Sequence, residues 1–159
     1  MLRWSGTMKK GERISSFVQQ LGSDPASPLD PCYQGFFRCF NAKQYYEAHD
    51  VLEHLWLRQR DENHLFFKGL IQTAGAFVHL QKQFLRPDHP KDGARLRPAV
   101  RLFHLALQNL DPYQPVHMSL DVANLRVLCR RLADEIVASD FRHNPWHPAH
   151  PPQLQLGAV

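Results

Sequence analysis

The sequence is poor in the residues that build disulfide scaffolds and glycine-rich loops. Its 159 residues include only three Cys and eight Gly. Three cysteines form an odd and sparse set, which argues against a disulfide framework and favours a reducing compartment. Glycine is too scarce for several phosphate-cradling loops, and no phosphate loop, dinucleotide fingerprint or nucleophile elbow occurs. The sequence therefore does not indicate any of the enzyme classes that carry one of these three motifs.

Long apolar runs are missing as well. The most apolar segment, residues 65–80, contains Lys68, Gln72, Thr73 and His79. It is too short and too polar to span a bilayer, which requires about 20 apolar residues. The first 13 residues carry charge, but no apolar run of signal-peptide length follows them. We therefore expect no membrane contact and a cytoplasmic location.

Composition and charge fit one globular domain. Hydrophobic residues make up 43% of the chain and charged residues 21%, with a formal net charge of +4. This length is enough to bury a sizeable core, and the composition is not that of a disordered chain. The mild positive charge is compatible with an acidic partner, but it does not require nucleic acid, which we do not expect to be bound.

Proline spacing shows where helices can run, because proline breaks helix interiors. Between the prolines the apolar residues recur at helical spacing and no strand periodicity is present. We expect an all-α fold, a single bundle of about five helices, over residues 31–40, 42–60, 63–84, 93–110 (or from 98) and 119–139. Residues 1–28 are expected to form an irregular extension with a short turn near residues 14–21. The bundle domain then covers residues 29–140, and residues 141–159 form a Pro/His-rich tail that is irregular or mobile.

Polar residues interrupt the apolar faces of the second and third expected helices. His49 and Glu53 are four residues apart and lie at the edge of the apolar stripe that ends at Trp56. Glu47, Asp50 and His54 fall on the opposite side and are expected to be solvated. On the next helix Gln72 and His79 share a face, and two polar groups on so apolar a helix need partners. Antiparallel packing would bring His49 and Glu53 within reach of Gln72 and His79.

This group of residues is open to three interpretations. The first is a satisfied structural network that fixes helix register, since buried polar groups are normally paired. The second is a divalent metal site with His49, Glu53 and His79 as ligands, which would make the protein a metal-dependent, hydrolase-like enzyme. It is not favoured, because the Glu-x-x-His spacing of di-metal bundles is absent. The third is an acid–base or small-ligand pocket lined by Trp56 and Tyr45 or Tyr46. The sequence leaves enzymatic activity and any cofactor open.

The same segment resembles the DUF309 family of small helical proteins. The family pattern Tyr-x-x-His-(Asp/Glu)-x-x-Glu-x-x-Trp is similar to Tyr46, His49, Asp50, Glu53 and Trp56, and a following Gly-Leu-Ile-Gln helix ending near a His is similar to residues 69–72 and His79. The resemblance extends over about residues 31–137. It implies a helical bundle of unknown function and carries no catalytic residues to this chain.

Two further features bear on partners. Arginines gather on the last two expected helices, at Arg95, Arg97, Arg101, Arg126, Arg130 and Arg131. A solvated, salt-bridged face is the favoured interpretation, and a protein- or RNA-binding module using these faces is the alternative. The phenylalanines of residues 36–40 suggest a homodimer face, unless the core absorbs them. We interpret the three cysteines as structural and the His-rich tail as polar chain rather than as a metal site.

Overall fold

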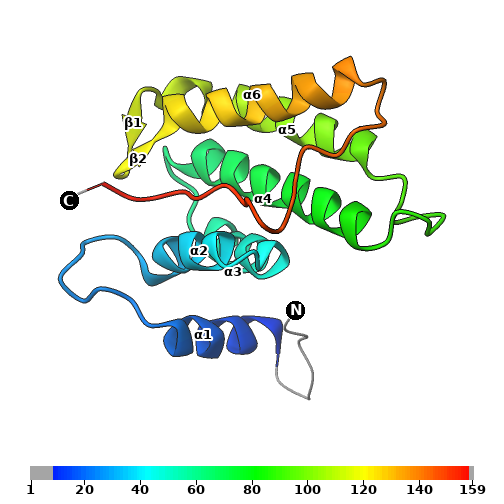
Figure 1. Cartoon of the computed structure of the whole chain (residues 1–159). Helices are drawn as coiled ribbons and strands as arrows, with labels where there is room; N and C mark the ends of the chain where they lie inside the picture. The colour runs from blue at the N-terminus through cyan, green and yellow to red at the C-terminus, as the bar shows by residue number, and fades with distance from the viewer. Residues whose placement is uncertain (1–8, 158–159) are drawn as a thin grey trace.

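Proline and capping residues set the helix boundaries. The computed structural model describes residues 9–157 (Figure 1). Asp30 accepts a hydrogen bond from the Cys32 amide at 2.7 Å, with Pro31 in the first helical position of α2, and Asp121 caps α6 through the Asn124 amide at 2.9 Å. These side chains satisfy amides that a helix start leaves unpaired. The six α-helices in this part of the chain are α1 (Lys10–Leu21), α2 (Pro31–Asn41), α3 (Tyr45–Arg58), α4 (His64–Leu85), α5 (Leu96–Leu110) and α6 (Val122–Ala138).

The all-α fold class is confirmed, and the structure adds a 3-10 turn, a hairpin and an N-terminal helix to the five expected helices. A 3-10 turn, η1 (Asp111–Tyr113), and a short antiparallel hairpin, β1 (Val116–His117) with β2 (Leu120–Asp121), join α5 to α6. The N-terminal segment, expected to be irregular, contains the complete helix α1. Its apolar side, Ile14, Phe17 and Val18, is buried against the bundle. So short a helix is marginal by itself, and its packing against α2 and α3 stabilises it.

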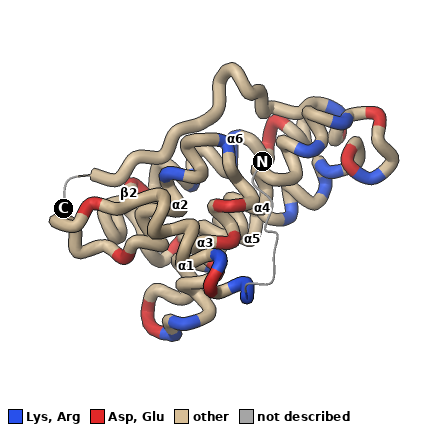
Figure 2. Tube along the Cα trace, turned by 90° about the horizontal axis from the view of Figure 1, so that it is seen from below, with Lys and Arg blue, Asp and Glu red and all other residues tan. Residues whose placement is uncertain are grey.

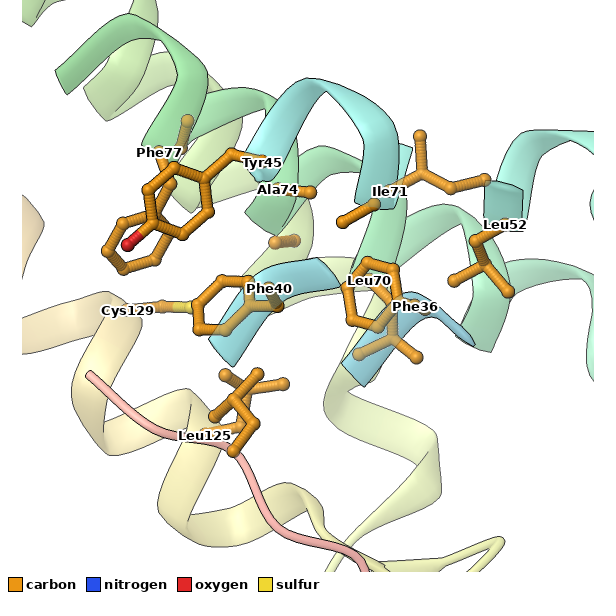
Figure 3. Packing of buried hydrophobic residues seen from close by; sticks show 14 of the residues in the cluster. Phe36, Phe40, Tyr45, Leu52, Leu70, Ile71, Ala74, Phe77, Leu125 and Cys129 are labelled. Carbon is orange, nitrogen blue, oxygen red and sulfur yellow. The ribbon is translucent and has the colours of Figure 1, made fainter. Parts of the chain in front are cut away.

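Aromatic residues from α2, α3 and α4 fill the centre of the core (Figure 3). Phe40 meets Tyr45 and Phe77 edge-on, with ring centroids 5.1 and 5.0 Å apart, and Tyr45 stacks on Phe77 at 5.2 Å. Such pairs contribute about 0.5–1.5 kcal/mol each beyond their area burial. Phe36 and Phe40 are fully buried and Phe37 nearly so. The core therefore absorbs these phenylalanines, and they do not form the dimer face that the sequence suggested.

Small residues on α4 allow α5 to lie close. A Cβ atom on Gly69 would stand 2.8 Å from Cγ of Leu110, and one on Gly75 would stand 3.1 Å from Cδ1 of Leu102. The helix that approaches closely along this side of α4 is therefore α5. The pairing is antiparallel, so the end of α4 lies beside the start of α5.

The C-terminal segment is irregular, as expected, but it is packed along the bundle as a strap from residue 141 to residue 157 (Figure 1). Trp146 is buried and its indole N–H donates to the Tyr45 hydroxyl at 3.0 Å. Asn41 exchanges two 2.8 Å hydrogen bonds with the backbone of Leu154. The strap then ends at the hairpin, where the Gly157 amide donates to the Ser119 carbonyl at 2.7 Å. No helix among residues 9–157 is long and apolar enough to cross a bilayer.

Candidate functional site

The polar residues of α3 face α1. His49 Nδ1 lies 3.2 Å from Asp50 Oδ1, and its Nε2 lies 3.7 Å from Glu53 Oε2. Lys10 of α1 approaches the same carboxylates, 3.5 Å from Glu53 Oε1 and 3.9 Å from Asp50 Oδ1. The side chains of His49 and Glu53 are 32% and 29% exposed, so water reaches this cluster. It attaches α1 to α3.

Two carboxylates expected to be solvated are buried instead. Glu47 is fully buried and Asp50 is 2% exposed. Both residues lie opposite the main apolar stripe of α3. The sequence gives no sign that α1 packs beside α3, and with α1 in place little of the surface of α3 remains open to water (Figure 1). The Glu47 carboxylate lies near the Cys39 thiol. Burial, and to a smaller extent the negative charge of Glu47, raise the pKa of that thiol to about 12. The expectation for His54 was closer, since it remains partly exposed.

Trp56 forms a separate aromatic contact. Its indole stacks on the His64 ring at 4.9 Å between centroids, and the Arg60 guanidinium lies 5.5 Å from the indole centroid. Trp56 Nε1 and His64 Nδ1 are buried and have no hydrogen-bond partner among the described residues. The pair joins the end of α3 to the start of α4, and no hydrogen bond, ion pair or ring contact among residues 9–157 joins it to His49.

Gln72 and His79, the candidate site residues of α4, face α5. Gln72 Oε1 accepts from Asn109 Nδ2 at 2.8 Å. His79 Nδ1 lies 3.1 Å from Arg95 Nη1, and Arg95 binds Asp92 through Nε at 2.9 Å and Nη2 at 2.6 Å. The pKa of His79 falls to about 4, because burial disfavours the charged ring and Arg95, Lys82 and Arg101 repel its proton. These contacts fasten α4 to α5.

The structure therefore divides the candidate site residues among three places: the α1–α3 interface, the α3–α4 junction at Trp56, and the α4–α5 interface. His49 and Glu53 are brought together, but Gln72 and His79 contact α5 rather than α3. Between residues 9 and 157 no three His, Cys, Asp or Glu side chains are grouped to hold a metal ion. The trio His49, Glu53 and His79 is thus not assembled as a ligand set. Helical spacing correctly predicts that the two candidate residues of each helix share a face. It does not predict which neighbouring helix that face contacts.

A different surface feature lies along α6. A groove of about 540 Å³ is lined by Gln114, Ala123, Arg126, Val127, Arg130, Arg131, Asp134 and Glu135. A second hollow of about 460 Å³, between α5 and α6, is lined by His104, Leu107, Gln108, Asp111, Arg126 and Arg130. Arg126 and Arg130 border both. The sequence predicts that these arginines share a helix face, but it does not predict the hollows beside them.

The arginines of this face are only partly neutralised. Arg131 pairs with Glu135 at 3.1 Å, as the salt-bridged interpretation expects. Arg126 is held by the Leu107 carbonyl at 3.2 Å and by Asp111 at 3.4 Å. Arg130 is exposed and has no ion-pair partner among the described residues. It stands between the two hollows as an unpaired cation.

Comparison with known proteins supports the family resemblance over the centre of the chain. Residues 33–87 match the family model described as Domain of unknown function (DUF309), which confirms the resemblance for that segment. The matched segment runs from α2 to just past α4 and includes His49, Glu53, Trp56, Gln72 and His79. Helices α1, α5 and α6 and the strap lie outside it. No curated protein and no solved structure gives a match.

Proposed function

We propose that the protein is a non-catalytic binding module that holds an acidic polypeptide segment of a partner along α6. The observation that carries this proposal is that Arg126 and Arg130 border both hollows of the α5–α6 surface. The polar residues of α3 and α4 have a structural role in this proposal. They connect helices to one another, and none of them lines either hollow.

The chemistry of the α6 groove favours a polypeptide with both acidic and apolar residues. Ala123 and Val127 supply an apolar floor, and Val127 is 64% exposed. An exposed apolar side chain beside an unpaired cation, here Arg130, offers burial and charge pairing to the same ligand. An amphipathic helix bearing glutamates would meet both requirements.

RNA fits this groove less well. Its lining contains no aromatic side chain on which a base could stack, and stacking is the usual contact for single-stranded RNA. Asp134 and Glu135 stand in the same lining and would repel a backbone that carries a phosphate at every nucleotide, whereas a peptide can place its few glutamates beside the arginines alone. The binding of an acidic segment needs only the arginine side of the groove.

The location that we propose is the cytoplasm. Cys32, Cys39 and Cys129 are all free and buried. Free thiols are typical of proteins kept in a reducing compartment.

A charge-reversal experiment tests the proposal. The probe is a fluorescein-labelled helical peptide of about 15 residues with glutamates on one face and leucines on the other. We expect full-length protein to bind it, and Arg130→Glu to weaken binding at least tenfold, about 1.4 kcal/mol, in fluorescence anisotropy. Arg142→Glu makes the same charge change at an exposed site outside the groove, and should leave binding within about twofold of the parent protein.

Two results would contradict the proposal. One is equal affinity of the parent protein and the Arg130→Glu variant for the acidic peptide, with both folded by circular dichroism. The other is tight binding of a single-stranded RNA oligonucleotide without binding of the peptide, which would assign the arginine face to nucleic acid.

A further inference from the structure

The junction of α4 and α5 carries a second concentration of positive charge. Residues 82–101 contain six Lys or Arg and two Asp, a net charge of +4, which equals the formal net charge of the whole chain. Figure 2 shows these basic positions gathered at the end of the bundle where α4 leads into α5. The rest of the chain is therefore neutral on balance, and a negatively charged ligand would be attracted to this end.

The carboxylates of the junction do not neutralise it. Asp92 is shared between Arg86 at 3.0 Å and Arg95 at 2.6 Å. Lys82 and Arg101 have no ion-pair partner among residues 9–157. Lys82 lies three residues after His79 on α4 and thus on the same side of that helix. Arg101 lies on α5, next to Leu102, which packs against Gly75 of α4 one turn before His79.

The contact with Arg95 fixes which nitrogen of His79 carries the proton. A guanidinium has donors only, so His79 Nδ1 must accept the 3.1 Å hydrogen bond from Arg95. The neutral ring therefore bears its proton on Nε2. That Nε2–H has no hydrogen-bond partner in the described part of the chain, and it is not among the buried unpaired atoms. It is a donor that reaches the surface, and the cations Lys82 and Arg101 stand near enough to the ring to help lower its pKa.

We propose that His79, Lys82 and Arg101 bind the phosphoryl group of a small phosphomonoester. The site lies on the α4–α5 side of the bundle and shares no residue with the α6 groove, so it is independent of the function proposed above.

A phosphoryl group suits this set of donors better than a carboxylate does. It carries nearly two negative charges near neutral pH, and each of its three peripheral oxygens can accept more than one hydrogen bond, so all three donor side chains can be used. The Arg101 guanidinium can bind two of its oxygens in parallel, and Lys82 supplies a compact point charge. Arg95 is fixed by Asp92 and therefore holds the imidazole in one orientation without needing to move. The low pKa of His79, about 4, keeps the ring neutral and its tautomer unchanged at neutral pH.

Nuclear magnetic resonance of the full-length protein tests the site directly. Long-range 15N–1H spectra recorded at pH ~7.5 follow the His79 Nε2 signal. Glycerol 3-phosphate or inorganic phosphate is added at constant ionic strength. We expect a saturable shift of that signal with both compounds and no comparable shift with sodium chloride. Lys82→Glu and Arg101→Glu should each weaken binding at least tenfold, since each removes a charge-assisted contact.

Lys68→Glu is the matched control. Lys68 is an exposed lysine of the same helix, about 20 Å from Lys82 along the axis. This variant should bind within about twofold of the parent protein if local contacts, rather than net charge, decide affinity. Equal losses in Lys68→Glu and Lys82→Glu would overturn the site, as would shifts with chloride as large as those with phosphate.

A membrane source of the phosphoryl group is distinguished by sedimentation with phosphatidylcholine vesicles that contain phosphatidic acid. Co-sedimentation without any shift by the soluble phosphomonoester would overturn the assignment to a small ligand. A shift by the soluble compound that is lost in Arg101→Glu supports it, provided that circular dichroism shows this variant folded.

Discussion

The polar residues of α3 and those of α4 lie in one DUF309-matched segment, yet they make contacts of different strength. On α3, His49 and Glu53 are about one-third exposed, and the Lys10 contacts are 3.5 and 3.9 Å long. On α4, His79 and Gln72 meet α5 at 3.1 and 2.8 Å, and Arg95 is 12% exposed. Water competes with the first set and much less with the second. The comparison indicates that the α4–α5 interface depends on its polar contacts, whereas the α1–α3 interface is held mainly by apolar packing.

The largest effect should come from removing Arg95. Arg95→Met leaves Asp92 without its closest cation and His79 without its donor, inside an interface largely closed to water. We expect the melting temperature to fall by roughly 10 °C, since breaking a buried pair from one side is strongly destabilising. Differential scanning calorimetry measures it. A loss no larger than that of the surface variant Arg142→Glu would show that the α4–α5 interface does not depend on its polar contacts.

The stability of the α4–α5 interface should decrease as the pH falls. His79 has a pKa of about 4 in the folded chain and about 6.5 when unfolded. Because the folded pKa is depressed, the stabilisation is complete above pH ~6.5 and is lost as the pH falls towards ~4. After discounting for partial exposure, we expect the melting temperature to drop by about 5 °C over that range. The His79→Gln variant should lack this drop, and an unchanged acid profile in that variant would refute the assignment.

The Gln72 contact should contribute less. Gln72→Leu keeps the volume of the side chain but removes the acceptor of the Asn109 amide. We expect a loss of about 1 kcal/mol, or roughly 3 °C in melting temperature. The double variant Gln72→Leu/Asn109→Leu tests the contact itself. If the two residues interact, the double variant loses less than the sum of the single losses.

The smallest effect is expected on α3. Glu53→Gln removes the carboxylate that lies 3.5 Å from Lys10 and 3.7 Å from His49, in a cluster that is partly exposed to water. We expect a loss below about 0.5 kcal/mol in urea unfolding at low salt, and none at about 1 M sodium chloride, where exposed pairs are screened. A salt-independent loss as large as that of Gln72→Leu would make the α3 cluster equivalent to the α4 contacts.

The site was less predictable than the fold for a definite reason. Spacing along a helix shows which side chains share a face, so the pairing of His49 with Glu53 follows from four residues of separation. It does not show which helix covers that face. Asp50 lies opposite the main apolar stripe, so periodicity predicts a solvated side chain where the structure has a buried one. Antiparallel packing of the two helices predicts His79 beside α3, whereas its partner Arg95 lies 16 residues further along the chain, beyond a loop.

The sequence by itself determined the elements. Proline positions and 3.6-residue periodicity fix helices α2 to α6 within a few residues, because these signals act locally. Only the tertiary structure decided that residues 10–21 form a stable helix, that the Pro-rich tail is a packed strap, and that the polar residues of α3 and α4 face different neighbours. Those outcomes depend on contacts between distant segments, whose free energy no local pattern records.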